Sequence, residues 1–109
     1  MQRNELDRAD LAGMAGRMKL MSHPERLLML CRMDEGEVSV NELVDLTGLS
    51  QSAVSQHLAN LREAGVVQVR GEAQTRWYRL VDPVVSGVIA TLCALCGTTT
   101  QGEAALAAG

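Results

Sequence analysis

The sequence predicts a mainly α-helical domain with one small β-hairpin, in the order α-α-α-α-β-β-α. A Ser39–Glu42 capping box begins one short amphipathic segment, and a turn at Thr47–Ser50 joins it to a second. This is the pattern of a helix-turn-helix. After Gly65 the apolar period changes from about 3.6 to about 2 residues, which indicates strands. A helical apolar pattern returns after Pro83. These features predict a winged helix-turn-helix domain over residues 1–97.

The first predicted helix runs from Glu5 to Met21. Its apolar residues recur at three- and four-residue spacing and form one stripe, made of Leu11, Met14, Met18 and Met21. Gly13 and Gly16 each weaken this helix by about 1 kcal/mol relative to Ala. We therefore expect the helix to need a partner surface in order to persist.

The second predicted helix begins at Pro24, which suits a first helical position, after Ser22 or His23 as the N-cap. It ends at Asp34–Gly36. Its buried face is expected to consist of Leu27, Leu28, Leu30 and Cys31.

Two shorter helices follow and form the helix-turn-helix. The third begins after the capping box and stops at Gly48, with Val40, Leu43, Val44 and Leu46 expected inward. Ser50 caps the fourth, which extends to about Ala64 and is stopped by Gly65. Its inward positions are Val54, Leu58 and Leu61.

The hairpin and a last helix complete the domain. Val66–Arg70 and Thr75–Leu80 are the predicted strands, joined by residues 71–74. Asp82 and Pro83 open the last helix, whose apolar residues are Val85, Val88, Ile89, Leu92 and Leu95. Residues 98–109 are small, polar and aperiodic, and we expect a disordered tail there.

Composition limits the function further. The chain has 109 residues, is 47% hydrophobic and has no apolar run of the roughly 18–20 residues that a membrane span needs. No basic-then-apolar leader opens it, so we expect a cytoplasmic protein. Its three cysteines are an odd number, which favours free thiols in a reducing compartment.

The charge distribution favours a nucleic-acid partner despite a net charge of −3. Residues 50–80 hold four arginines and two glutamates, so the middle of the chain is a basic segment between acidic ones. The start of the fourth helix carries uncharged hydrogen-bonding side chains where Lys and Glu are usual. Such residues at a recognition-helix N-terminus read base edges in the major groove. The candidate DNA-binding residues on this helix are Ser50, Gln51, Ser52, Ser55, Gln56, His57 and Arg62.

The hairpin adds a second group of candidates. Arg70, Gln74 and Arg76 flank or form its tip, where arginine suits phosphates or a narrow minor groove. Ordinary solvated charges on an edge hairpin would explain any one of these arginines equally well. His57 and His23 have no second ligand at helical spacing, so we predict no histidine metal site.

Three segments resemble the ArsR/SmtB family of small winged-helix repressors. They are residues 22–28 (SHPERLL), 49–58 (LSQSAVSQHL) and 61–67 (LREAGVV), with Tyr78 and Leu80 in the second wing strand. The resemblance covers residues 19–96. It implies a homodimer built from the first and last helices, bound to double-stranded operator DNA with two-fold symmetry.

The cysteines resemble those of the biofilm growth-associated and sulfide-responsive repressors within that family. There, a second-helix Cys pairs with a Cys near the end of the last helix, and oxidation or persulfide formation releases DNA. Cys31 matches the first position. Cys96 is the favoured partner and Cys93, one helical turn earlier, is the alternative. The inducer implied is a reactive sulfur species or an oxidant.

Other interpretations remain open. The family's usual metal sites do not carry over, because residues 38–46 hold no Cys and residues 83–97 hold no His or acid. The metal alternative is a three-thiolate As(III) site made of Cys31, Cys93 and Cys96. In another interpretation, all three cysteines are inert residues of the hydrophobic core. An enzyme is not expected, because no catalytic constellation or cofactor motif is present. A protein-only dimeric interaction module is the alternative from a different class.

Overall fold

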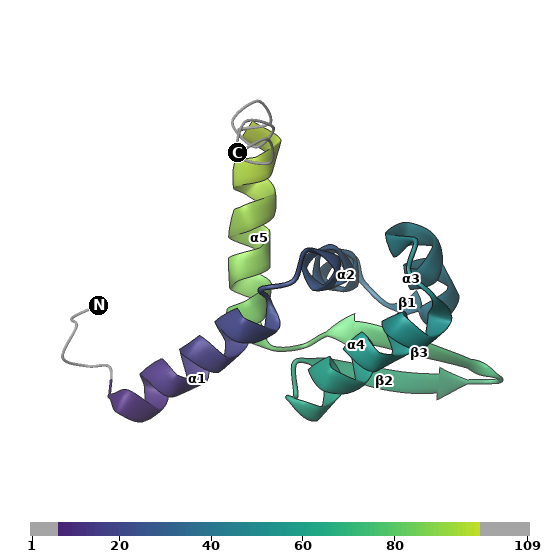
Figure 1. The fold of residues 1–109 in the computed structure, drawn as a ribbon, viewed down its shortest axis with the longest axis horizontal. Helices are drawn as coiled ribbons and strands as arrows, with labels where there is room; N and C mark the ends of the chain where they lie inside the picture. The colour runs from purple at the N-terminus through teal and green to yellow at the C-terminus, as the bar shows by residue number, and fades with distance from the viewer. Residues whose placement is uncertain (1–6, 99–109) are drawn as a thin grey trace.

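The computed structural model describes residues 7–98 and shows five helices and a three-stranded sheet (Figure 1). The helices are α1 (Arg8–Leu20), α2 (Pro24–Glu35), α3 (Val40–Thr47), α4 (Gln51–Glu63) and α5 (Pro83–Thr98). The strands are β1 (Val38–Ser39), β2 (Val67–Glu72) and β3 (Thr75–Leu80). The order confirms the winged helix-turn-helix that the sequence predicts.

The sheet contains one strand that the sequence does not reveal. β1 pairs antiparallel with the central strand β3, with Val38 opposite Tyr78 and Ser39 opposite Trp77. Strand β3 has its predicted bounds, whereas β2 extends two residues further toward the tip than predicted, with Glu72 opposite Thr75. This leaves a two-residue turn in which Ala73 adopts a positive φ of 55°.

The predicted helix boundaries hold at most ends. Ser39 and Glu42 form the predicted capping box at the start of α3. Gly48 ends α3 in the left-handed region at φ 74°, which suits a residue without Cβ. His23, rather than Ser22, is the N-cap of α2, and its side chain makes no capping hydrogen bond.

The two chain ends differ from the prediction or lie outside the described residues. Helix α1 begins at Arg8 behind an Asp7–Asp10 capping box, and the predicted start at Glu5 falls outside the described residues. Thr98 is the last helical residue of α5, whereas we expected it to open the tail. The rest of the predicted tail, residues 99–109, lies outside the described residues.

The core lies between α2, α3, α4, the sheet and the start of α5. Its completely buried large side chains include Met29, Leu30, Met33, Leu43, Leu58, Leu61 and Ile89. Two inward predictions are wrong for the single chain. Leu28 and Leu46 are exposed, whereas Met29 and Met33 of α2 occupy the core. No helix among residues 7–98 is long and apolar enough to cross a membrane.

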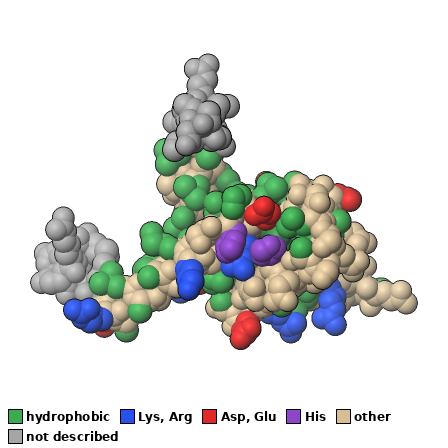
Figure 2. Space-filling view, viewed as in Figure 1, with side chains coloured by type: hydrophobic (Ala, Val, Ile, Leu, Met, Phe, Trp, Pro, Cys, Tyr) green, Lys and Arg blue, Asp and Glu red, His purple; other side chains and the backbone are tan. Residues whose placement is uncertain are grey.

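Helices α1 and α5 extend away from the winged body in different directions (Figure 1). Both carry large apolar side chains that stay exposed in the single chain, namely Leu11, Met14, Met18, Val88, Leu92 and Leu95. Figure 2 shows hydrophobic side chains along the visible parts of both helices. The predicted stripe on α1 is therefore almost entirely uncovered, and only Met21 at its end is buried.

Candidate DNA-binding face and thiol pair

The N-terminal half of α4 presents the predicted polar row to solvent. Gln51, Ser52, Ser55 and Gln56 are all exposed, because Val54, Leu58 and Leu61 turn the opposite face of the helix into the core. The Ser50 hydroxyl accepts the N–H of Ala53 at 3.1 Å and so caps the helix. The polar row is thus held on a helix that is anchored along its buried face and at its start.

His57 lies apart from that row. It is half-buried, and its Nδ1 accepts a hydrogen bond from Arg26 Nε of α2 at 3.0 Å. Burial lowers the pKa of His57, and the charges of Arg26 and His23 lower it further. Its predicted place beside the base-reading residues needs correction, because the ring faces α2 and joins the two helices.

The arginines of the wing and of α4 are not equivalent. Arg70 donates from Nε and Nη2 to the two carboxylate oxygens of Glu37, each at 2.9 Å, and its Nη1 lies 3.4 Å from Glu72. This bidentate pair lowers the pKa of Glu37. Arg76 and Arg62 are exposed and form no ion pair within residues 7–98. Gln74 is exposed in the hairpin turn.

The second candidate site joins α2 to α5. Cys31 Sγ of α2 and Cys93 Sγ of α5 are 3.3 Å apart, within hydrogen-bonding distance for two thiols. Cys31 is half-buried, whereas Cys93 and Cys96 are exposed. The structure therefore brings the alternative partner, Cys93, to Cys31, while Cys96 lies about one helical turn further along α5.

Neighbouring groups keep Cys31 protonated. Burial, the hydrogen bond with Cys93 and the charge of Asp34 raise the pKa of Cys31 to about 12. Asp34 Oδ1 accepts a hydrogen bond of 2.6 Å from the Ser86 hydroxyl, a second polar link between α2 and α5. Neither Asp34 nor Ser86 was predicted from the sequence. Asp34 lies one turn beyond Cys31 on α2, so helical spacing was the available signal for it.

The As(III) alternative lacks a third ligand in this arrangement. Among the described residues, no three His, Cys, Asp or Glu side chains come together in a way that could hold a metal ion. Cys31 and Cys93 are adjacent, but Cys96 does not complete a three-thiolate group with them.

Comparisons with known proteins give the same fold and a consistent family. Residues 23–69 match the family model described as "Bacterial regulatory protein, arsR family". The chain is 44% identical over 79 residues to the HTH-type transcriptional regulator YgaV of Escherichia coli, covering 72% of this chain and 80% of that protein. It is 38% identical over 78 residues to the biofilm growth-associated repressor of Xylella fastidiosa, covering 72% and 68%.

Solved structures agree with these sequence matches. Reduced HlyU from Vibrio cholerae superposes with a TM-score of 0.77 at 41% identity, covering 87% of this chain and 97% of that chain. The repressor BigR from Xylella fastidiosa superposes with a TM-score of 0.79 at 34% identity, covering 87% and 96%. These relatives are DNA-binding transcription regulators rather than enzymes. The chain belongs to the ArsR family of winged-helix transcription regulators.

Proposed function

We propose that this ArsR-family regulator is a homodimeric repressor whose operator affinity is lowered when Cys31 and Cys93 are linked. The observation that carries the signal is the 3.3 Å separation of the two Sγ atoms across the α2–α5 junction. The exposed row at the start of α4 reads base edges, and exposed arginines on α4 and the wing contact phosphates. The operator is double-stranded DNA with two-fold symmetry, matching the symmetry of the dimer.

The dimer is built from α1 and α5. Their exposed apolar side chains would form an unusually large uncovered surface on a monomer, and such surfaces mark interaction sites. A second copy of the chain covers them in this proposal. The two recognition helices are then held at the spacing of successive half-sites, about 34–36 Å.

The thiol chemistry needs only a sulfur donor or an oxidant. With a low-molecular-weight persulfide, the exposed Cys93 reacts first: its thiolate form attacks the sulfane sulfur, becomes a persulfide and releases the donor as a thiolate. The protonated Cys31 thiol, whose Sγ is 3.3 Å from Cys93 Sγ, then loses its proton as its sulfur attacks the inner sulfur of that persulfide, so that a disulfide forms and hydrogen sulfide leaves. With hydrogen peroxide, the first cysteine becomes a sulfenic acid with loss of hydroxide, and the second displaces water to form the same disulfide.

Linking the two thiols constrains two elements that matter for DNA binding. Helix α2 packs on the helix-turn-helix, and α5 belongs to the proposed dimer surface. The sulfurs must approach from 3.3 Å to about 2.05 Å in a disulfide, so the junction shifts when the bond forms. A coupling of only about 1–3 kcal/mol between the two sites would change operator affinity by about 5–150-fold.

Mass mapping combined with DNA titration tests the signal. Reduced protein is treated with glutathione persulfide or with hydrogen peroxide, digested for peptide masses and titrated with operator DNA recovered by selection. We expect a Cys31–Cys93 link and a loss of operator affinity. The Cys31→Ser and Cys93→Ser variants should retain affinity after treatment, whereas the Cys96→Ser control should respond like the parent chain.

Other outcomes would contradict this proposal in distinct ways. A Cys31–Cys96 link would return the pairing that the sequence favoured. Release of DNA by As(III) without a sulfur adduct would favour the metalloid alternative. Unmodified thiols with undiminished binding would make the cysteines structural.

The base-reading part has its own test. Gln51→Ala and Ser55→Ala should lose operator preference, with little change in affinity for random DNA, because they remove base-edge contacts rather than phosphate contacts. Fluorescence anisotropy with both DNAs at fixed salt measures the ratio. Equal affinity of the parent chain for operator and random DNA would contradict sequence-specific binding and favour a protein-only interaction module.

A further inference from the structure

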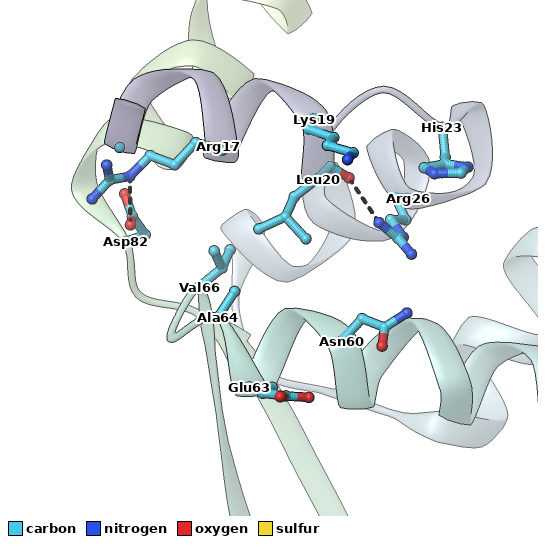
Figure 3. A pocket seen from close by; sticks show the side chains of 12 residues that line it. Arg17, Lys19, Leu20, His23, Arg26, Asn60, Glu63, Ala64, Val66 and Asp82 are labelled. Atoms are coloured by element: carbon cyan, nitrogen blue, oxygen red, sulfur yellow. Dashed lines mark hydrogen bonds and ion pairs between the residues drawn. The ribbon is translucent and has the colours of Figure 1, made fainter. Parts of the chain in front are cut away.

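A pocket of about 830 Å³ lies apart from both proposed sites. It is bordered by the C-terminal half of α1, the start of α2 and the C-terminal end of α4 (Figure 3). Its size falls within the usual range of small-molecule sites, roughly 300–1,000 Å³. Neither the polar row of α4 nor the thiol pair contributes a residue to it.

One part of the pocket lining is apolar. Leu20 of α1 points into the pocket, and Ala64 and Val66 lie across from it, beyond the end of α4 (Figure 3). Gly13 and Gly16 form part of the α1 wall. A Cβ on Gly16 would meet nothing within 4 Å, so packing within the chain does not require glycine there. Glycine costs helix stability at this position and leaves the wall open.

The polar groups are unevenly distributed around this apolar surface. Lys19, Arg26 and Asn60 lie on one side in the view of Figure 3, and the Arg17–Asp82 ion pair lies on the other. Arg17 Nε donates to Asp82 at 2.9 Å, so its charge is already balanced. The side with Lys19 and Arg26 is therefore the electropositive one.

Arg26 is held in place by two hydrogen bonds, but part of its guanidinium has no hydrogen-bond partner among the described residues. Its Nε donates to His57 and its Nη1 to the carbonyl oxygen of Leu20 at 3.4 Å. Its Nη2 makes no hydrogen bond within the described residues, and neither Lys19 nor Asn60 Nδ2 donates one there. Glu63 is the opposing acid on the rim, and it makes no ion pair with any described residue.

We propose that this pocket binds a small organic monocarboxylate with an apolar body. The carboxylate accepts hydrogen bonds from Lys19, Arg26 Nη2 and the Asn60 amide, while the apolar body lies on Leu20, Ala64 and Val66. Glu63 repels a second negative charge, so a dianion of the same shape binds more weakly. The proposal does not depend on the thiol chemistry, because no cysteine lines the pocket.

Three matched probes test the ligand class on the full, reduced chain. Phenylacetate carries one carboxylate and an apolar ring, phenylacetamide is its uncharged counterpart, and phenyl phosphate carries up to two charges. Titrations are followed by amide chemical shifts. We expect phenylacetate to bind with shifts centred on Leu20, Asn60 and Val66, and the other two probes to bind at least tenfold more weakly.

Two variants and a control locate the site. Lys19→Gln should weaken phenylacetate binding about tenfold by removing the cation. Gly16→Leu should abolish it by filling the pocket. Ala15→Leu is the matched control, because Ala15 is exposed on the same helix but does not line the pocket, and it should bind phenylacetate like the parent chain.

Several results would overturn the proposal. These are no phenylacetate binding at millimolar concentration, equal binding of phenylacetamide, and binding that survives both Lys19→Gln and Gly16→Leu. If sizing shows that Gly16→Leu alters the oligomeric state, Lys19→Gln decides alone. Loss of the thiol response, by contrast, would leave this result unaffected, so failures of the two proposals are distinguishable.

Discussion

At Arg26 and His57 one hydrogen bond connects α2 to the middle of the recognition helix. Arg26 Nε can only donate, so His57 Nδ1 accepts and the imidazole is neutral, with its proton on Nε2. Protonation of His57 would put an N–H on Nδ1 directly opposite the N–H of Arg26 Nε, and would place a positive imidazolium beside the positive guanidinium. Figure 2 shows the two histidines together on one face, and their ring centroids are 6.1 Å apart.

This hydrogen bond predicts a pH dependence of stability. Because the folded pKa of His57 is lowered below its ordinary value of about 6.5, the unfolded chain binds more protons in mildly acidic solution. The contribution of His57 to the free energy of unfolding should be fully present above about pH 7 and should fall as the pH drops through about 6.5 toward the folded pKa. Urea unfolding between pH 5 and 7.5 measures this slope.

A matched pair of variants isolates His57. His57→Asn keeps an acceptor for Arg26 but does not titrate, so the slope between pH 5 and 7 should flatten. His23→Asn removes the other histidine and should keep most of the slope. An unchanged slope in His57→Asn would contradict the assignment. Glu37 and Asp82, whose pKa values are lowered below ordinary carboxyl values, act only in more acidic solution.

The wing arginines predict different responses to salt. Arg76 is exposed without an ion pair in the described structure, whereas Arg70 is held bidentately by Glu37. Each phosphate that a cation no longer neutralises should reduce the slope of log K against log[salt] by about 0.9. Arg76→Ala should lower the slope by about that amount per subunit, and Arg70→Ala should lower it less. The reverse order, measured by anisotropy from 50 to 200 mM salt, would show that Arg70 leaves Glu37 on DNA.

At the scale of elements, Ser39 belongs to two structures at once. It ends β1 and caps α3, where its hydroxyl accepts the N–H of Glu42 at 3.2 Å while Glu42 Oε1 accepts the N–H of Ser39. Ser39→Ala should therefore destabilise the fold by about 1 kcal/mol, the usual cost of losing an N-cap. Asn41→Ala, on an exposed position of the same helix, should not destabilise it. Urea unfolding compares the two, and equal midpoints would argue against the capping box.

The elements predictable from sequence are those fixed by local signals. The Ser39–Glu42 capping box and the Gly48 turn depend on neighbouring residues and appear where predicted, and the hairpin strands lie within one or two residues of their predicted bounds. Strand β1 was not predictable, because two residues show no period and the strand exists only through pairing with Tyr78 and Trp77. Local sequence signals also could not determine whether Cys93 or Cys96 lies next to Cys31. This choice depends on the angle at which α5 crosses α2, which packing alone determines.

The burial of α2 illustrates the same limit. Four consecutive apolar residues, Leu27 to Leu30, contain no clear helical phase, so the inward face was ambiguous. The structure turns Met29, Leu30 and Met33 into the core and leaves Leu28 exposed. Leu46 is exposed in the same way near the end of α3. The polar row of α4 was better defined, because its buried partners Val54, Leu58 and Leu61 fix the phase.

At the scale of the whole molecule, the two terminal helices carry most of the large hydrophobic side chains that stay exposed. None of the residues of α1 is buried, although its end is tied to the start of α5 by the Arg17–Asp82 ion pair. Burial alone would raise the pKa of Asp82, but N–H bonds from Val85 and Val84 and the Arg17 guanidinium outweigh it. The ion pair holds the end of α1 beside the start of α5, and the two helices diverge from there with both apolar faces uncovered. In the proposed dimer, a second copy of the chain covers both faces.

Met18 offers the sharpest test of that assembly, because it is 68% exposed, the largest fraction among the exposed large hydrophobic side chains. In a two-fold interface every substitution occurs twice, so Met18→Glu would bury two unpaired carboxylates or force the subunits apart. We expect monomers by light scattering and loss of operator binding together, since one recognition helix holds only one half-site. Leu46→Glu introduces the same charge on an exposed leucine away from α1 and α5, and it should remain dimeric. A dimeric Met18→Glu chain that still binds operator would exclude α1 from the interface and leave α5 alone to form it.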